Sequence, residues 1–317
     1  MVTKTTAGNL IILTAVTSFI LGVYFQHDQV LRNLKKLVQT DPYAFQIRNK
    51  LYDVLSIFQV SKTSKNPTRM EEIMKYGFPG LDDIRLYSDF VLSYDRRNRV
   101  AHWVYEHLRA TCLSNSHGVQ RRHAQYMADM DIPSNFRSDT DDYHQSGFDR
   151  GHLASAGNHK CLQTHCNETF YFTNITPQVG KGFNRDAWNK LENYVRDLTE
   201  RYDSVYVCTG PLYMPKMQAN GKMYVEYETI GRNTVAVPTH FFKVITVESK
   251  LPEGRPYMEA YLMPNAPIDD SVDIRSFLSE IRVIERAAGL QFFNGLRRSH
   301  FFATNYPTAT EIYQNFS

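Results

Sequence analysis

Short runs rich in β-branched and aromatic residues recur along most of this chain, and they limit the folds it can adopt. Two such runs lie within residues 87–108, and others follow at 204–210, 222–230, 234–249 and 258–264. Side chains of these types pack well on a pleated surface and favour strands. Helical segments do not alternate regularly with the runs, as a parallel βαβ fold would require. The sequence therefore predicts an α+β fold with a mixed β-sheet body.

Within residues 69–317, two segments carry apolar residues at helical intervals instead. The first covers residues 184–201 and begins with Asn184, a residue type that often caps helices. Residues spaced four apart share one slowly drifting face of a helix, which here carries Asn184, Trp188, Glu192 and Arg196. Trp188 is more readily explained as a core residue than as a platform for substrate. A second helix is predicted over residues 277–288, ended by Gly289.

The run SGFDRGHLASAGNH contains residues suited to phosphodiester hydrolysis. The attacking water must lose a proton, and an imidazole with a pKa near the working pH is a good base, which makes His152 the predicted base. Charge on the leaving oxygen requires a hard cation, and Mg²⁺ takes only one or two protein oxygens, so one asparagine carbonyl suffices. Guanidinium groups match phosphate geometry, and Arg137 and Arg196 are available.

The DRGH motif, followed by NITPQ and then by an asparagine, AW, LE and an arginine, resembles the DNA/RNA non-specific nucleases, whose active site is a ββα-metal finger. The stretches EIMKYGFPG, YVCTGPLY, VAVPTHFFKV and MPNAPIDDSV are similar to mitochondrial members of that family. Ordered blocks of this kind, from about residue 70 to about residue 295, are far more specific than four letters. The resemblance implies Mg²⁺-dependent cleavage of DNA and RNA to 5′-phosphate ends, with Mn²⁺ as an alternative metal.

The resemblance also assigns a role to each matching residue. His152 matches the general base and Asn184 the direct Mg²⁺ ligand. Asn174 matches the second active-site asparagine, and Glu192 matches the acid that holds water at the metal. Arg196 matches the arginine near the phosphate, and Arg150 matches the arginine of the motif. Arg137, in a less regular context, matches a further phosphate-binding arginine. The aromatic-rich segments FDRGHLA and TFYFTNI are expected to be strands or strand ends, so that two strands and the helix surround one metal.

Each of these residues also has a non-catalytic interpretation. His152 alone is compatible with an ordinary hydrogen-bonded histidine, and Asn184 with a simple helix cap. Glu192 and Arg196 form a pair four residues apart, of the kind that decorates many exposed helices. The order of the motifs along the chain, rather than any one residue, favours catalysis.

Zinc ligands are a separate possibility in the segment that follows the motif, which contains His159, Cys161, His165 and Cys166. Their spacing fits no common zinc finger, and we therefore do not interpret them as a zinc site. The segment also departs from the family pattern, with Gly157 where alanine is common and LQTH before Cys166. The even cysteine count, which Cys112 and Cys208 complete, indicates no dense disulfide framework, and Cys208 is expected to be a buried thiol.

The N-terminal segment differs from the rest. Residues 1–26 include no charge after Lys4, and residues 7–25 would span about 28 Å as a helix, close to the hydrocarbon core of a bilayer. A membrane anchor is predicted; a secretory signal peptide and a cleaved mitochondrial presequence are the alternatives. Residues 27–68 are predicted to form amphipathic helices and a linker, and residues 69–317 the nuclease domain.

The net charge of +3 excludes a strongly basic coat for nucleic acid. Contact with the phosphate backbone of DNA and RNA must come from local clusters, such as those at 96–99 and 121–123. The resemblance further implies a homodimer in the mitochondrial intermembrane space, a role in apoptotic or mitochondrial DNA degradation, and entry into the nucleus after release. Two alternatives are a nucleic-acid-binding protein whose catalysis has lapsed and a secreted digestive nuclease. A glycosylation acceptor at Asn174 counts against the second, because a glycan there would block the site.

Overall fold

The computed structural model describes residues 68–113, 118–248, 257–294 and 296. Within these ranges no helix has the length and apolar character needed to cross a bilayer. The predicted anchor at residues 7–25 and the amphipathic helices predicted after it lie outside the described residues.

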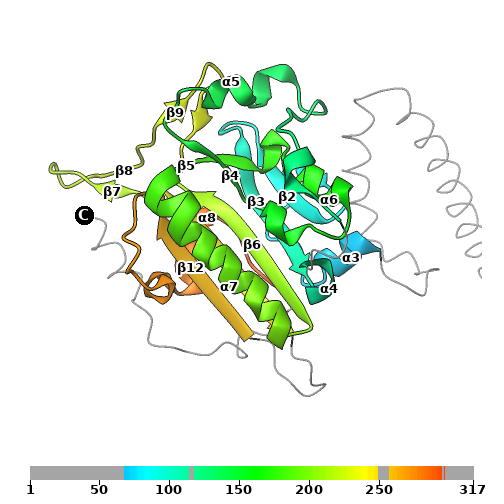
Figure 1. Cartoon of the computed structure of the whole chain (residues 1–317). Helices are drawn as coiled ribbons and strands as arrows, with labels where there is room; N and C mark the ends of the chain where they lie inside the picture. Colours follow the sequence, from blue (N-terminus) through cyan, green and yellow to red (C-terminus); the bar gives the residue numbers. More distant parts are fainter. Residues whose placement is uncertain (1–67, 114–117, 249–256, 295, 297–317) are drawn as a thin grey trace, which may run out of the picture. The chain divides into compact units, whose positions relative to one another are not determined.

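Six antiparallel strands form the central sheet, in the order β1-β2-β3-β6-β11-β12 (Figure 1). Neighbouring strands pair over most of their length; Cys208, for example, lies opposite Tyr105 on one side and Val244 on the other. The sheet and the helices around it confirm the predicted α+β class. The strands are β1 (Ile84–Leu86), β2 (Phe90–Asp95), β3 (Val100–Leu108), β6 (Ser204–Leu212), β11 (His240–Glu248) and β12 (Tyr257–Pro264).

Both faces of this sheet are covered. Along β6, Val205 and Val207 belong to one apolar cluster, and Tyr206 and Cys208 belong to another. The first cluster is completed by α7 (Trp188–Arg201), which lies across the sheet in Figure 1, and the second by α3 (Arg69–Ile73) and α8 (Ile281–Ala288). Because side chains alternate between faces, a strand covered on both sides is largely apolar along its whole length. Cys208 is a buried free thiol, as predicted.

A separate two-stranded sheet carries the DRGH motif. β4 (Asp149–His152) pairs antiparallel with β5 (Ile175–Gln178). The segment at residues 169–175, predicted as a strand or strand end, leads into β5 at its last residue, and Phe172–Asn174 form a 3₁₀ turn just before it. The side chain of Asn174 donates a hydrogen bond to the carbonyl of Thr169 at 2.8 Å and closes this turn, so the strand starts at Ile175.

The long predicted helix begins later than expected. A wider, π-helical turn over Gly180–Ala187 precedes α7, and within it the N–H of Asn184 bonds to the carbonyl five residues earlier. Gly182 has a φ of +84°, a conformation that glycine adopts without strain. Asn184 is therefore not the helix cap, and its side chain contacts Asp149 instead. The prediction that Trp188 is a core residue is confirmed, since it is 1% exposed.

The second predicted helix is shorter than residues 277–288. α8 begins at Ile281, and Gly289 ends it at a φ of +67°, as predicted. Residues Ile274–Phe277 form a 3₁₀ turn. The remaining elements are α4 (Ala110–Leu113), α5 (Thr140–Tyr143), α6 (Gln163–Glu168), the 3₁₀ turns Arg121–His123, Ser134–Phe136 and Ala156–Asn158, and the strand pairs β7 (Lys216–Met217) with β8 (Met223–Tyr224) and β9 (Thr229–Ile230) with β10 (Val235–Ala236).

Candidate active site

A cavity of about 380 Å³ opens beside β4. Basic and polar side chains line it, among them Arg121, Arg150 and Asn184. The guanidinium of Arg150 lies over the ring of Tyr126, 4.2 Å from its centre. Arg121 was predicted only as part of a basic cluster. Nothing in the local sequence distinguishes it from Arg122, and only the fold places it on the cavity.

His152 lies among aromatic rings next to this cavity. The ring of Phe170 meets it edge-on at 4.6 Å between centroids, and that of Tyr126 is 5.9 Å away. Burial, together with the positive charges of Arg121 and His159, lowers the pKa of His152 to about 3. The ring is therefore neutral at neutral pH, and its Nε2 has no hydrogen-bond partner within the described residues. The expected pKa near the working pH was wrong, because desolvation disfavours the charged ring.

Asn174 fixes the backbone that follows His152. Its Oδ1 accepts from the N–H of Ala154 at 2.8 Å, and its Nδ2 donates to the Ala154 carbonyl at 3.0 Å. The side chain is completely buried. It therefore supports the position of His152 through the main chain, and no part of it is accessible to a glycan.

Asn184 is oriented by Asp149, which the sequence did not identify as a site residue. The Nδ2 of Asn184 donates to Asp149 Oδ2 at 2.9 Å. Arg185 donates to the same carboxylate through Nε at 2.8 Å and Nη2 at 2.5 Å, and these hydrogen bonds lower the pKa of Asp149 against the effect of burial. The amide nitrogen of Asn184 is thus engaged, and its carbonyl oxygen is directed away from Asp149. The signal in the sequence was the position of Asp149 in the DRGH motif itself.

Glu192 and Arg196 contact the loop after His152 rather than each other. Ser155 Oγ donates to Glu192 Oε2 at 2.8 Å, and Arg196 Nη1 donates to Asn158 Oδ1 at 2.9 Å. The described residues show no ion pair between the two side chains, so they do not form the surface pair considered above. Burial raises the pKa of Glu192, although the nearby charge of Lys243 opposes the shift.

Arg137 has no hydrogen bond to the other predicted residues within the described structure. The hydrogen bond of its guanidinium in the described structure runs from Nη1 to Met130 Sδ at 2.7 Å, and Arg137 does not line the cavity. The other predicted residues gather around β4, β5 and the beginning of α7.

The glycine of the motif is required by the packing of β4 on β5, because a Cβ at Gly151 would lie 2.0 Å from Cδ of the buried Gln178.

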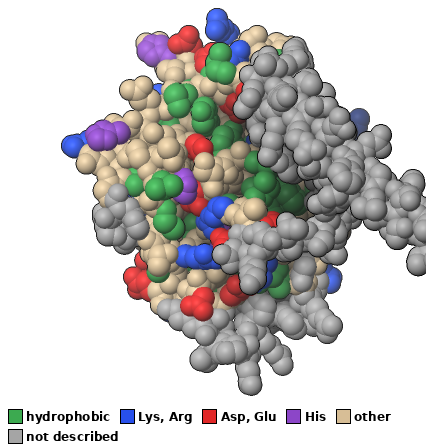
Figure 2. Space-filling model, turned by 90° about the vertical axis from the view of Figure 1, so that its right-hand side faces the viewer, with side chains coloured by type: hydrophobic (Ala, Val, Ile, Leu, Met, Phe, Trp, Pro, Cys, Tyr) green, Lys and Arg blue, Asp and Glu red, His purple; other side chains and the backbone are tan. Residues whose placement is uncertain are grey.

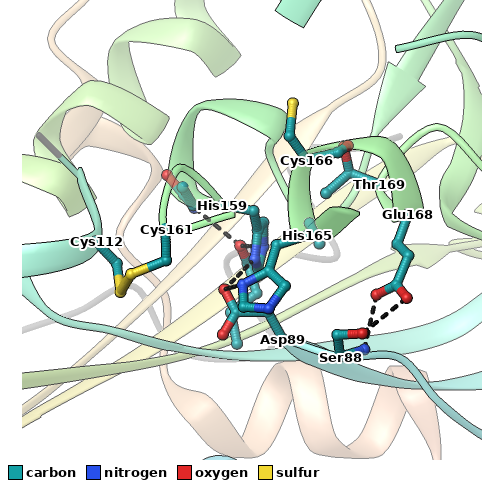
Figure 3. Close-up of polar contacts among 12 residues, drawn as sticks. Ser88, Asp89, Cys112, His159, Cys161, His165, Cys166, Glu168 and Thr169 are labelled. Carbon is teal, nitrogen blue, oxygen red and sulfur yellow. Dashed lines mark hydrogen bonds and ion pairs between the residues drawn. A yellow bond between two sulfur atoms is a disulfide. The ribbon is translucent and has the colours of Figure 1, made fainter. Parts of the chain in front are cut away.

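Figure 3 shows the residues that were considered for zinc. Cys161 forms a disulfide with Cys112, and Cys166 is a buried free thiol. His159 lies between two carboxylates, those of Asp89 and Glu106. The disulfide was not predicted, because its two cysteines are 49 residues apart and only the fold brings them together.

On the face shown in Figure 2, positive charge is local. Figure 2 shows a face on which basic, acidic and apolar side chains are interspersed, without one broad basic surface. This agrees with the small net charge of +3. The cavity beside β4 therefore depends on a few arginines, such as Arg121 and Arg150, to attract an anionic substrate.

Comparison with known proteins assigns this arrangement to a family. The family described as DNA/RNA non-specific endonuclease matches residues 69–299. The chain belongs to this endonuclease family. It is consequently a phosphodiester hydrolase, and the resemblance drawn from DRGH and NITPQ is confirmed.

Several characterised endonucleases of this family cover most of the chain. "Endonuclease G, mitochondrial" of Caenorhabditis elegans is 43% identical over 277 residues, which are 87% of this chain and 89% of the relative. The protein of the same name from Homo sapiens is 47% identical over 221 residues, covering 70% and 73% of the two chains. A solved structure described as "Crystal structure of the EndoG/EndoGI complex: Mechanism of EndoG inhibition" is 54% identical, with a TM-score of 0.73, and covers 75% of this chain and 96% of that one. The chain is thus a non-specific nuclease similar to endonuclease G.

Proposed function

We propose that this protein is a Mg²⁺-dependent endonuclease that cleaves both DNA and RNA to 5′-phosphate ends, with His152 as general base and Asn184 as metal ligand. One observation carries the proposal. A single stretch of chain, residues 149–155, contacts Asn184 through Asp149 at its beginning, and contacts Glu192 and Arg196 through Ser155 at its end. His152 lies between these two contacts. The proposed base, metal ligand, acid and arginine are therefore arranged along one segment of the chain, as in a ββα-metal finger.

The side chains around Asn184 fit a magnesium ion that keeps most of its water. Because its amide nitrogen bonds to Asp149, its carbonyl oxygen is the atom left for a hard cation. Mg²⁺ accepts such a site with few protein ligands, and Glu192 is suited to hold water near it by hydrogen bonds. Mn²⁺ prefers the same oxygen ligands and is expected to substitute. The bound metal would supply stabilisation of the charge on the leaving oxygen.

The remaining chemistry belongs to the side chains of the protein. Neutral His152 takes the proton of the attacking water at a ring nitrogen. Arg150 and Arg121 on the cavity wall, and Arg196 on α7, are suited to the non-bridging phosphate oxygens. These contacts are to phosphate, which DNA and RNA share, and this supports activity on both.

Cleavage assays on both nucleic acids test the proposal. The purified full chain is incubated with supercoiled plasmid or with RNA in Mg²⁺, Mn²⁺ or EDTA, and the product ends are mapped. We expect both substrates to be cut with either metal, and no cleavage in EDTA. The products should carry 5′-phosphates, so that ligase can rejoin them after annealing. Cutting in EDTA or 3′-phosphate ends would contradict the mechanism, and binding without cutting would favour the lapsed-enzyme alternative.

The proposed homodimer is supported by an apolar arm. The hairpin of β7 and β8 extends away from the body in Figure 1, and it and the following residues expose apolar side chains that are 37% to 52% accessible: Met217, Met223, Tyr224, Val225 and Tyr227. Such a patch favours burial against a second copy. Sedimentation should show a dimer that the pair Met223→Glu and Val225→Glu converts to a monomer, whereas Leu81→Glu, at an exposed apolar residue elsewhere, leaves it intact. A monomeric wild type would refute the dimer.

The relatives are named mitochondrial, which supports a mitochondrial location. We further propose that residues 7–25 anchor the protein in the inner membrane, with the nuclease facing the intermembrane space, and that release allows DNA degradation in the nucleus during apoptosis. Alkaline carbonate extraction of mitochondria should leave the full chain in the membrane pellet. Complete extraction would exclude the anchor.

A further inference from the structure

A chain of hydrogen bonds leads from Arg196 into the protein body. Arg196 Nη1 donates to Asn158 Oδ1 at 2.9 Å, and Asn158 Nδ2 donates to Glu106 Oε1 at 2.9 Å. Asn158 is 4% exposed and Glu106 is fully buried. Because one side of the Asn158 amide accepts and the other donates, the amide cannot flip without losing both bonds. The position of Glu106 therefore determines where Arg196 finds its acceptor.

His159 contacts the same carboxylate oxygen of Glu106 as Asn158 does. Its Nε2 is 3.0 Å from Glu106 Oε1, and its Nδ1 is 2.8 Å from Asp89 Oδ2. Both ring nitrogens face a carboxylate oxygen, and only the imidazolium form carries a hydrogen on each. Burial alone would lower the pKa of His159, but the hydrogen bonds and charges of Asp89 and Glu106 raise it to about 9. The ring is therefore a buried cation that joins two strands, with Asp89 just before β2 and Glu106 in β3.

The acceptors around Arg196 leave part of its guanidinium free for substrate. Nη1 contacts Asn158 and, at 3.4 Å, Ser155 Oγ, while Nη2 contacts Asn193 Oδ1 at 2.6 Å. A guanidinium has five N–H groups, so these three contacts orient it without using all of its donors. The neighbouring Gly157 leaves room for it, because a Cβ at this residue would lie only 3.1 Å from Arg196 Nη1.

We propose that His159 is a positioning residue for the nuclease reaction: clamped between Asp89 and Glu106, it fixes Glu106 and, through Asn158, sets the orientation of the Arg196 guanidinium toward the scissile phosphate. The inference rests on the proposed role of Arg196 and adds to it the buried residues on which that role depends. It also gives a function to the histidine of the GNH sequence, which follows the DRGH motif and which no zinc site explains.

His165 provides a matched control. Its Nδ1 lies 3.5 Å from the same Asp89 carboxylate, as Figure 3 shows, but it has no hydrogen bond to Glu106 among the described contacts. A substitution of His165 therefore perturbs the surroundings of Asp89 without breaking the route to Arg196, which is the series of hydrogen bonds from His159 through Glu106 and Asn158. Asn158→Ala has the complementary use, because it breaks the route next to Arg196 and leaves the contacts of His159 with both carboxylates in place.

The experiment measures kcat and KM for plasmid cleavage by the full chain. His159→Gln and Asn158→Ala are each expected to lower kcat about 10- to 100-fold, the usual effect of removing a supporting partner, with a much smaller change in KM. His165→Gln is expected to keep the wild-type kcat. Each substitution is also made in an Arg196→Ala background, where neither His159→Gln nor Asn158→Ala should lower kcat further, because residues acting through one group are not additive.

The outcomes separate this inference from the role of Arg196. If Arg196→Ala keeps the wild-type kcat, the role of Arg196 fails. If Arg196→Ala lowers kcat but Asn158→Ala does not, or if the losses multiply in the double variants, the route from His159 to Arg196 is refuted. Thermal unfolding is measured for every variant. Should His159→Gln not fold, Asn158→Ala alone decides, since it leaves the buried ion pairs intact.

Discussion

His152→Ala is expected to lower kcat for plasmid cleavage by about 10²- to 10⁴-fold, the range that a general base contributes, while the affinity for DNA stays nearly unchanged. The base acts as the proton leaves water, so its removal weakens the transition state more than the bound substrate. DNA affinity and the unfolding midpoint show whether the variant retains its fold. Added imidazole should restore part of the rate by entering the space next to Phe170 and Tyr126. Wild-type kcat in this variant would remove His152 from the mechanism.

The pH profile of the wild type tests the same residue without a substitution. Since the pKa of His152 is lowered to about 3 from 6.5, the ring remains a free base as the pH falls below neutrality. Protonation disables a base, so kcat should be lost only as the pH falls through the lowered pKa. At saturating Mg²⁺, the acid limb of kcat is therefore expected below pH 6.5. An acid limb centred at or above that value would contradict the desolvated environment of the ring.

Asn184→Ala is expected to raise the Mg²⁺ concentration that gives half-maximal activity by about 10- to 100-fold or more, because the proposed metal would lose its direct protein ligand. The measurement is the cleavage rate as a function of free Mg²⁺. Arg185→Ala is the matched control, since Arg185 bonds to the same Asp149 carboxylate but its side chain is 67% exposed. Its loss should change the Mg²⁺ requirement less than about fivefold, as is usual for an exposed ion pair. Identical Mg²⁺ curves for wild type and Asn184→Ala would show that Asn184 is not the ligand.

Features that depend on local spacing could be predicted from the sequence. The four-residue interval from Trp188 to Glu192 and Arg196 predicted a helix with one shared face, and the structure has that helix. Its beginning could not be predicted by the same argument, because the π-helical turn depends on the positive φ of Gly182 and on contacts with other segments. Asn184 therefore looked like a cap, although its side chain bonds to a strand 35 residues earlier.

Features that depend on tertiary contacts could not be predicted. The pKa of His152 follows from the aromatic rings that exclude water, and Phe170 and Tyr126 are distant from it in sequence. The roles of Asp149 and Asn158 depend on the side chain that each one meets, which is Asn184 in the π-helical turn for Asp149 and Arg196 in α7 for Asn158.

The disulfide between Cys112 and Cys161 has a consequence for stability that depends on the cell compartment. The segment between them contains His152 and most of the residues that line the cavity, from Arg121 to Arg150. Closing a loop of 49 residues reduces the conformational entropy of the unfolded chain, an effect of roughly 4 kcal/mol in the chain-entropy description. In a reducing compartment the same fold would lack this contribution. The local thiol–disulfide balance thus affects the free energy of unfolding of the fold that contains the catalytic segment.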